Sequence, residues 1–203
     1  KKDNAILVFH ALTGDQFVTG LNPITKKDGW WNYALGKGKA IDTDKYFIIC
    51  ANVLGGCMGS FGPSSINLNT GKPYGNDFPV ITINDMVNAQ YFLLKHYEIE
   101  KLFCVTGGSM GGMQVLQFVA NYPNASQTAI PIACTSNHSA QNIGLNELGR
   151  QAIMADANWQ NGKYGETNLS PNKGLSVARM AAHITYLSKD ALQEKFGRKL
   201  QER

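Results

Sequence analysis

Short runs of apolar residues, without regular polar alternation, recur along the chain as far as residue 134. Runs of this kind predict parallel strands that are covered on both faces of a sheet. The predicted strands are residues 5–9, 46–52, 102–106 and 128–134.

A helical period of apolar residues lies between the second and third runs. A helix predicted over residues 83–97 would gather on one face Met86, Ala89, Leu93 and Tyr97, flanked by Val87 and Leu94. Thr82 or Asn84 can cap its N-terminus, and Asp85 suits the positive end of the helix dipole. Strands that alternate with helices imply right-handed crossovers, so the sequence predicts a mostly parallel α/β sheet with helices on both faces.

The alternation stops at about residue 136. Residues 142–156 and 174–187 read as helices, and a polar, turn-rich segment over 158–172 separates them. We therefore predict an α/β core over residues 1–136 and a helical lid insertion over residues 137–203. Residues 55–77 are long and rich in Gly, Pro and Asn, which predicts a functional loop.

A serine lies between the third predicted strand and a helix predicted over residues 113–120. Ser109 is the centre of Gly-Gly-Ser-Met-Gly-Gly at residues 107–112. Gly-x-Ser-x-Gly between strand and helix is typical of the nucleophile elbow of the α/β-hydrolase fold, where the serine hydroxyl is exposed on a strained turn. Glycine avoids a collision as strand and helix approach each other. The alternative is a serine that only caps the helix.

Composition restricts the other classes of function. The net charge is +4 and the basic residues are scattered, which argues against nucleic acid as a partner. No apolar stretch approaches the roughly 20 residues of a membrane-spanning helix. The four cysteines lack a Cys-x-x-Cys pair, and three lie in or beside predicted strands, which favours a reduced, cytoplasmic compartment. The histidines are far apart and no acidic cluster joins them, so we predict no metal site.

Several further motifs accompany the serine in a fixed order. They are found at residues 10–15 (HALTGD), 52–57 (NVLGGC), 62–65 (GPSS), 71–75 (GKPYG), 139–141 (SAQ), 146–147 (NE) and 178–188 (ARMAAHITYLS). Together with residues 107–112, this series closely resembles the homoserine O-acetyltransferase family, a branch of the α/β-hydrolase superfamily. The likeness extends over almost the whole chain. Members of that family are longer on both sides, so the resemblance implies an internal fragment that is truncated at both ends.

The resemblance implies an activity and a set of residues. Ser109 would take an acetyl group from acetyl-CoA and pass it to the hydroxyl of L-homoserine, with no permanently bound cofactor. Backbone N–H groups of Met110 and Leu12 would stabilise the oxyanion. Arg179 would pair with the homoserine carboxylate, and Tyr186 would hydrogen-bond to the substrate; seven residues apart, both can project from one helix face. A solvated arginine and a packed tyrosine are the alternative.

The histidine base that activates such a serine is harder to assign. In this fold the order is Ser, then Asp or Glu, then His, after late strands. His10 fits beneath the oxyanion loop and His96 fits a helix C-terminus, whereas His138 and His183 fit structural positions. We therefore expect both triad partners to lie beyond Arg203, and this chain alone to be inactive.

Other activities of the same fold stay open. A succinyl group could replace the acetyl group, another alcohol could replace homoserine, or water could be the acceptor, as in an esterase. The resemblance also implies a homodimer of the full-length protein.

Overall fold

The computed structural model describes residues 3–166 and 169–198. The chain divides into two compact units, Lys1–Ser136 and Asn137–Arg203, which we describe separately.

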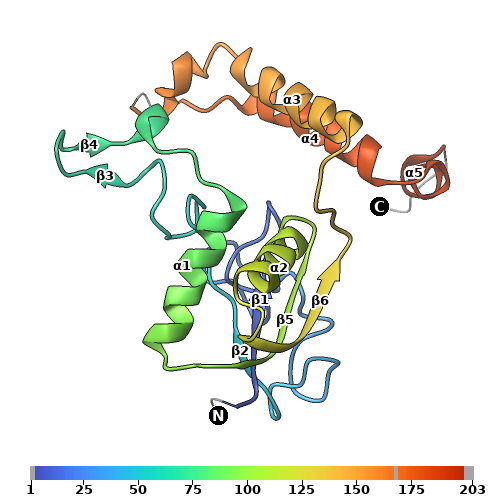
Figure 1. The fold of residues 1–203 in the computed structure, drawn as a ribbon. Helices are drawn as coiled ribbons and strands as arrows, with labels where there is room; N and C mark the ends of the chain where they lie inside the picture. Colours follow the sequence, from blue (N-terminus) through green and yellow to red (C-terminus); the bar gives the residue numbers. More distant parts are fainter. Residues whose placement is uncertain (1–2, 167–168, 199–203) are drawn as a thin grey trace. The chain divides into compact units, whose positions relative to one another are not determined.

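A parallel sheet forms the centre of the first unit (Figure 1). Its strands are β1 (Ala5–Phe9), β2 (Phe47–Ile49), β5 (Leu102–Gly108) and β6 (Ser126–Ile132), in the order β2-β1-β5-β6. All of the neighbouring pairs are parallel. The predicted strands are therefore confirmed, although β2 is shorter than the sequence indicated and β5 is longer. Their carboxyl ends meet at one edge, where Phe9 of β1 is paired with Gly107 of β5.

The segment between β2 and α1 contains a small hairpin. Its strands β3 (Ile66–Asn67) and β4 (Lys72–Pro73) are antiparallel, and the short 3-10 helix η1 (Gly75–Asp77) follows them. This hairpin lies within the predicted loop over residues 55–77.

Helix α1 (Ile83–His96) begins with a capping box. The Thr82 hydroxyl accepts a hydrogen bond from the Asp85 N–H at 3.2 Å, and the Asp85 carboxylate accepts one from the Thr82 N–H at 2.8 Å. Thr82 is therefore the cap residue. The buried residues of α1 are Val87, Gln90 and Leu94, so the centre of its buried face lies at the predicted flank of the apolar stripe. Because one of these core positions is occupied by a polar residue, Gln90, the apolar pattern of the sequence does not show it.

Helix α2 (Met110–Asn121) directly follows Ser109 and starts three residues earlier than predicted. It packs with α1 on one face of the sheet, where Phe9, Val105 and Phe118 belong to the larger apolar cluster. The opposite face is covered by the segment between β1 and β2, whose Val18 and Leu35 join a second cluster. The central strands β1 and β5 are thus largely buried, as their continuous apolar runs predicted, whereas β6 is exposed along most of its length, so its predicted burial was wrong.

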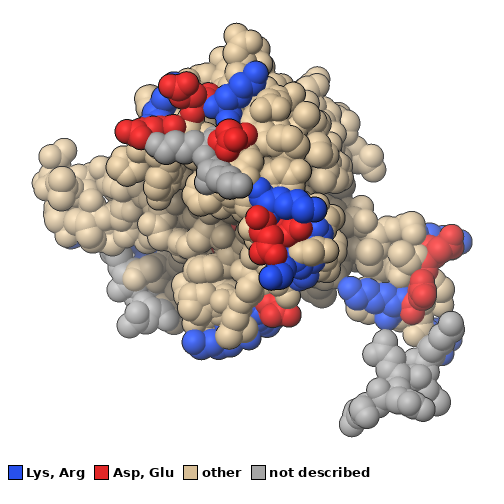
Figure 2. Space-filling view, turned by 90° about the horizontal axis from the view of Figure 1, so that it is seen from below, with Lys and Arg blue, Asp and Glu red and all other residues tan. Residues whose placement is uncertain are grey.

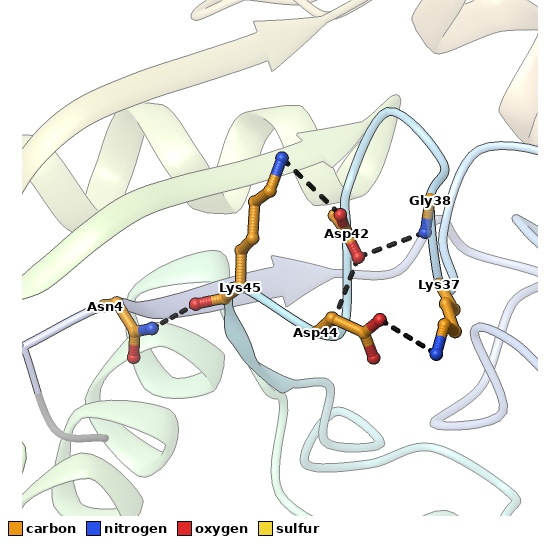
Figure 3. A network of polar contacts seen from close by, with 6 residues as sticks. All are labelled: Asn4, Lys37, Gly38, Asp42, Asp44 and Lys45. Atoms are coloured by element: carbon orange, nitrogen blue, oxygen red, sulfur yellow. Dashed lines mark hydrogen bonds and ion pairs between the residues drawn. The ribbon is translucent and has the colours of Figure 1, made fainter.

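A polar network fixes the chain immediately before β2 (Figure 3). The Asp42 carboxylate accepts hydrogen bonds from the N–H groups of Asp44 at 3.0 Å and Gly38 at 3.1 Å, and these bonds lower the pKa of Asp42. Lys45 forms an ion pair with Asp42 at 3.6 Å, and its carbonyl accepts the side-chain amide of Asn4. This network ties the start of β2 to the residue before β1.

The second unit is helical. It comprises α3 (Ala140–Met154), the short 3-10 helices η2 (Gln160–Gly162) and η3 (Tyr164–Glu166), α4 (Asn172–Tyr186) and α5 (Lys189–Phe196). Helices α3 and α4 pack against each other, which confirms the two predicted helices with shifted ends. Gly174 permits the contact, because a Cβ there would lie 2.3 Å from the carbonyl oxygen of Ala152.

The carboxylate of Asp156 anchors the start of α4. It accepts N–H groups from Gly174 at 2.8 Å and from Asn158 at 2.9 Å, and these hydrogen bonds lower the pKa of Asp156.

Acidic and basic side chains lie beside one another on the face shown in Figure 2, which agrees with the scattered charges of the sequence. Among the described residues, no helix is both long and apolar enough to cross a membrane.

Candidate active site

Ser109 connects β5 to α2 with a backbone that non-glycine residues rarely adopt. Its φ and ψ are 56° and −120°. Two hydrogen bonds fix this conformation: the Ser109 N–H donates to the carbonyl of Ile132, and the Ser109 carbonyl accepts the N–H of Met113, both at 3.0 Å. The Ser109 side chain is exposed and makes no capping hydrogen bond to α2. The alternative of a simple helix cap is therefore wrong.

The glycines around Ser109 are required by backbone contacts with the neighbouring strand. A Cβ at Gly111 would lie 2.1 Å from the carbonyl oxygen of Phe9, and one at Gly107 would lie 2.6 Å from the same atom. The sequence predicted a collision between β5 and α2; the end of β1 is the closer obstacle. At Gly108, by contrast, an added Cβ meets nothing within 4 Å.

The two predicted oxyanion donors come from adjacent strand ends. Phe9 is paired with Gly107, and Leu12 and Met110 each follow their paired residue by three positions. Met110 is the first residue of α2, ahead of the first hydrogen bond of that helix, so its N–H lacks an intrahelical acceptor. Among the described residues, the N–H of Leu12 also has no acceptor. Ser109, Met110 and Leu12 therefore meet at one end of the sheet.

His10 holds the loop that carries Leu12. Its ring is buried, and Nε2 accepts a hydrogen bond from the N–H of Val53 at 3.0 Å. Nδ1 must then carry the proton of the neutral ring, which it donates to the carbonyl of Ala11 at 2.7 Å. His10 thus lies buried at the start of the loop after β1, and the oxyanion role of that loop stays a prediction. Because both ring nitrogens are engaged, His10 is not available as the base for Ser109.

Of the remaining histidines, His96 belongs to the same unit as Ser109, and His138 and His183 belong to the second unit. His96 ends α1, which leads to the start of β5, so the length of that strand, about 20 Å for seven residues, separates it from the elbow. His183 lies in the second unit, where its Nδ1 donates to the carbonyl of Arg179 at 2.8 Å. His138 belongs to that unit too.

Arg179 and Tyr186 both belong to α4 and are exposed, Tyr186 to 81 %. Among the described residues, neither the Arg179 guanidinium nor the Tyr186 hydroxyl has a hydrogen-bond or ion-pair partner. Tyr186 is therefore not the packed tyrosine of the alternative interpretation. Both residues belong to the second unit, whereas Ser109 belongs to the first.

The cysteines and acidic residues do not suggest further chemistry. Burial, and secondarily the charge of Asp15, raises the pKa of Cys50 to about 12, so this thiol stays protonated. Among the described residues, no group of three or more His, Cys, Asp or Glu side chains could hold a metal ion.

One feature of the site was missed by the sequence analysis. Gln114 of α2 is fully buried, and its side-chain amide contacts the carbonyls of both His10 and Met110. The only signal in the sequence was a polar residue on an otherwise apolar helix face.

Comparison with known proteins places these features in a family context. A family model described as the alpha/beta hydrolase fold matches residues 4–203. A curated homoserine O-acetyltransferase of Pelagibacter ubique (strain HTCC1062) is 77 % identical over 202 residues, which cover 100 % of this chain and 54 % of the relative. The motif resemblance is thereby confirmed.

Two solved structures are also similar. The homoserine O-acetyltransferase from Bacillus anthracis has a TM-score of 0.89 at 31 % identity, over 98 % of this chain and 55 % of that one. Esterase E22 has a TM-score of 0.85 at 33 % identity, over 98 % of this chain and 57 % of that one. The chain thus spans about half the length of the proteins it matches.

Proposed function

We propose that this chain, which belongs to the α/β-hydrolase fold family, supplies Ser109 as the nucleophile of a homoserine O-acetyltransferase. One observation carries the proposal. Ser109 is exposed on a strained strand-to-helix turn, in a chain that is 77 % identical over 202 residues to a relative named for that activity.

The reaction proceeds in two acyl transfers. The Ser109 hydroxyl loses its proton to a base and attacks the thioester carbonyl of acetyl-CoA, while the N–H groups of Leu12 and Met110 stabilise the oxyanion. The C–S bond breaks, coenzyme A leaves as the thiol with the proton, and acetyl-Ser109 remains. The homoserine hydroxyl then attacks the ester, which releases O-acetylhomoserine and restores the serine. We place the acid and base outside the described residues, so this chain alone is expected to be inactive.

Arg179 and Tyr186 bind the acceptor in this proposal. The unpaired guanidinium of Arg179 suits bidentate binding of the homoserine carboxylate, and the Tyr186 hydroxyl hydrogen-bonds to the same substrate. The names of the relatives favour acetyl over succinyl as the group transferred, and homoserine over other alcohols. A homodimer in the cytoplasm, in the methionine pathway, completes the proposal; sedimentation velocity of the full-length protein tests the dimer.

An esterase is the second candidate. Esterase E22 is about as similar to this chain as the Bacillus anthracis acetyltransferase is, in identity and in TM-score. The elbow serves both reactions, since only the acceptor differs: water in one, the homoserine hydroxyl in the other.

A chimera distinguishes the two candidates. This chain would replace the matched residues of the Pelagibacter ubique relative, giving what we call the full-length chimera. Release of free thiol from acetyl-CoA would be followed with and without homoserine, and Ser109→Ala would serve as the inactive control. We expect release that depends on homoserine and on Ser109. Thiol release at the same rate without homoserine would favour the esterase and contradict the transferase.

A further inference from the structure

Two buried amide side chains lie where helices α1 and α2 meet. Gln90 of α1 is 3 % exposed and Gln114 of α2 is 0 % exposed, although both sit among apolar core residues such as Val87 and Val115. Their side chains are joined, because Gln90 Nε2 donates to Gln114 Oε1 at 3.4 Å. A buried amide costs about 1–3 kcal/mol unless it is hydrogen-bonded, so an apolar pair would pack these helices at least as well.

The other end of the Gln114 amide reaches the active site. Its nitrogen lies 3.4 Å from the carbonyl of His10 and 3.4 Å from the carbonyl of Met110, and an amide nitrogen has one N–H for each. His10 stands two residues before Leu12, and Met110 is itself the second proposed oxyanion donor. One planar group therefore contacts the backbone on both sides of the oxyanion site.

We propose that Gln114 is a positioning residue that sets the spacing between the N–H groups of Leu12 and Met110. The inference rests on the proposed function. Gln90 holds the Gln114 amide in the orientation that presents its two N–H groups to the two carbonyls. Among the described residues, the Oε1 atom of Gln90 is buried without a hydrogen-bond partner, and the bond to Gln114 is the one polar contact of this side chain.

The substitution Gln114→Met in the full-length chimera tests this role, because methionine fills a similar volume without the amide. We expect kcat to fall about 10- to 100-fold, since a misplacement of about 1 Å can cost ~10²-fold in rate. The KM for acetyl-CoA should change less than about twofold, because both oxyanion donors act on the transition state. The melting temperature should not fall. The matched control is Gln117→Met on the same helix, whose amide donates to Asn121, and it should leave kcat unchanged.

A tetrahedral probe separates positioning from a general structural role. Methylboronic acid adds to an active-site serine as a mimic of the tetrahedral intermediate, so its affinity should fall in parallel with kcat in Gln114→Met. Gln90→Met should act in the same direction with a smaller loss, and adding it to Gln114→Met should cost nothing more.

Unchanged kcat and boronate affinity in Gln114→Met would overturn the proposal, as would a loss of activity that only follows the amount of folded protein. The Gln90→Met variant keeps the test decisive if Gln114→Met folds poorly: an unchanged kcat there contradicts the proposal. The proposed function fails separately, if Ser109→Ala retains the activity of the unmodified chimera.

Discussion

Two regions contain all of the proposed site residues except Leu12: the elbow around Ser109, and the helical hairpin formed by α3 and α4, which we call the hairpin below. They are built differently. At the elbow, backbone contacts determine the position of every group: the Phe9 carbonyl approaches both flanking glycines, and Ile132 accepts the Ser109 N–H. In the hairpin, the helix backbones are fixed at Gly174 and Asp156, but Arg179 and Tyr186 are exposed side chains without partners among the described residues.

Because of this difference, the proposed roles at the elbow depend on backbone geometry, whereas those on α4 depend on side chains. Backbone geometry at the elbow fixes the proposed nucleophile, Ser109, and one proposed oxyanion donor, Met110. The side chains of α4 acquire a function only from the substrate that they face. Substitutions at the elbow should therefore affect folding and all chemistry, whereas substitutions on α4 should affect one substrate.

The largest expected effect follows from adding one methyl group at the elbow. Gly111→Ala places a Cβ against the Phe9 carbonyl, so β1 and α2 must separate, and we expect the full-length chimera to lose about 3 kcal/mol or more of stability and its activity. Gly108→Ala, the matched control, should change stability by less than about 0.5 kcal/mol. Urea unfolding measures both, and equal stability of the two variants would contradict the steric account.

The corresponding test in the hairpin is Gly174→Ala. The added Cβ would collide with the carbonyl of Ala152, and we expect a loss of roughly 2 kcal/mol, confined to the second unit. Gly144→Ala, in an open position of α3, should instead stabilise by about 0.5–1 kcal/mol. Hydrogen exchange followed peptide by peptide would locate the change; faster exchange throughout β1 and β5 would argue against separate units.

The sequence predicted local structure in both regions better than contacts between distant elements, for a physical reason. The strands, the elbow and both helices of the hairpin follow from patterns that steric and burial rules determine locally. The burial of Gln90 on α1 could not be predicted, because its hydrogen-bond partner, Gln114, lies across the helix interface. The contact between the glycines and Phe9 likewise needs the strand order β1-β5, which no local pattern specifies.

A smaller effect, limited to one substrate, is expected on α4. Arg179→Gln in the full-length chimera should raise the KM for homoserine about 10- to 100-fold, the value of a charged hydrogen bond of about 1.5–3 kcal/mol. The KM for acetyl-CoA should stay the same. Arg150→Gln is the control, since Glu147 already pairs with that arginine. An unchanged KM for homoserine would contradict carboxylate binding by Arg179 and favour the alternative, a solvated arginine.

The smallest effect concerns pH. Hydrogen bonds from Gly174 and Asn158 lower the pKa of Asp156 below its ordinary value of 3.8. The ionised carboxylate therefore stabilises α4 fully at pH values above 3.8, and this stabilisation disappears as the pH falls through the lowered pKa. Asp156→Asn should weaken exchange protection at the Gly174 amide at pH 7, and the difference from the unmodified protein should vanish in acid. A difference that persists in acid would assign the effect to packing.

Trapping the acyl-enzyme tests the central claim most directly. The full-length chimera would be mixed with acetyl-CoA in the absence of homoserine, quenched in acid, and analysed by intact mass and peptide mapping. We predict that one acetyl group is found on Ser109, and that homoserine added before the quench removes it. Acetylation at another residue, or full turnover without acetyl-Ser109, would contradict the account.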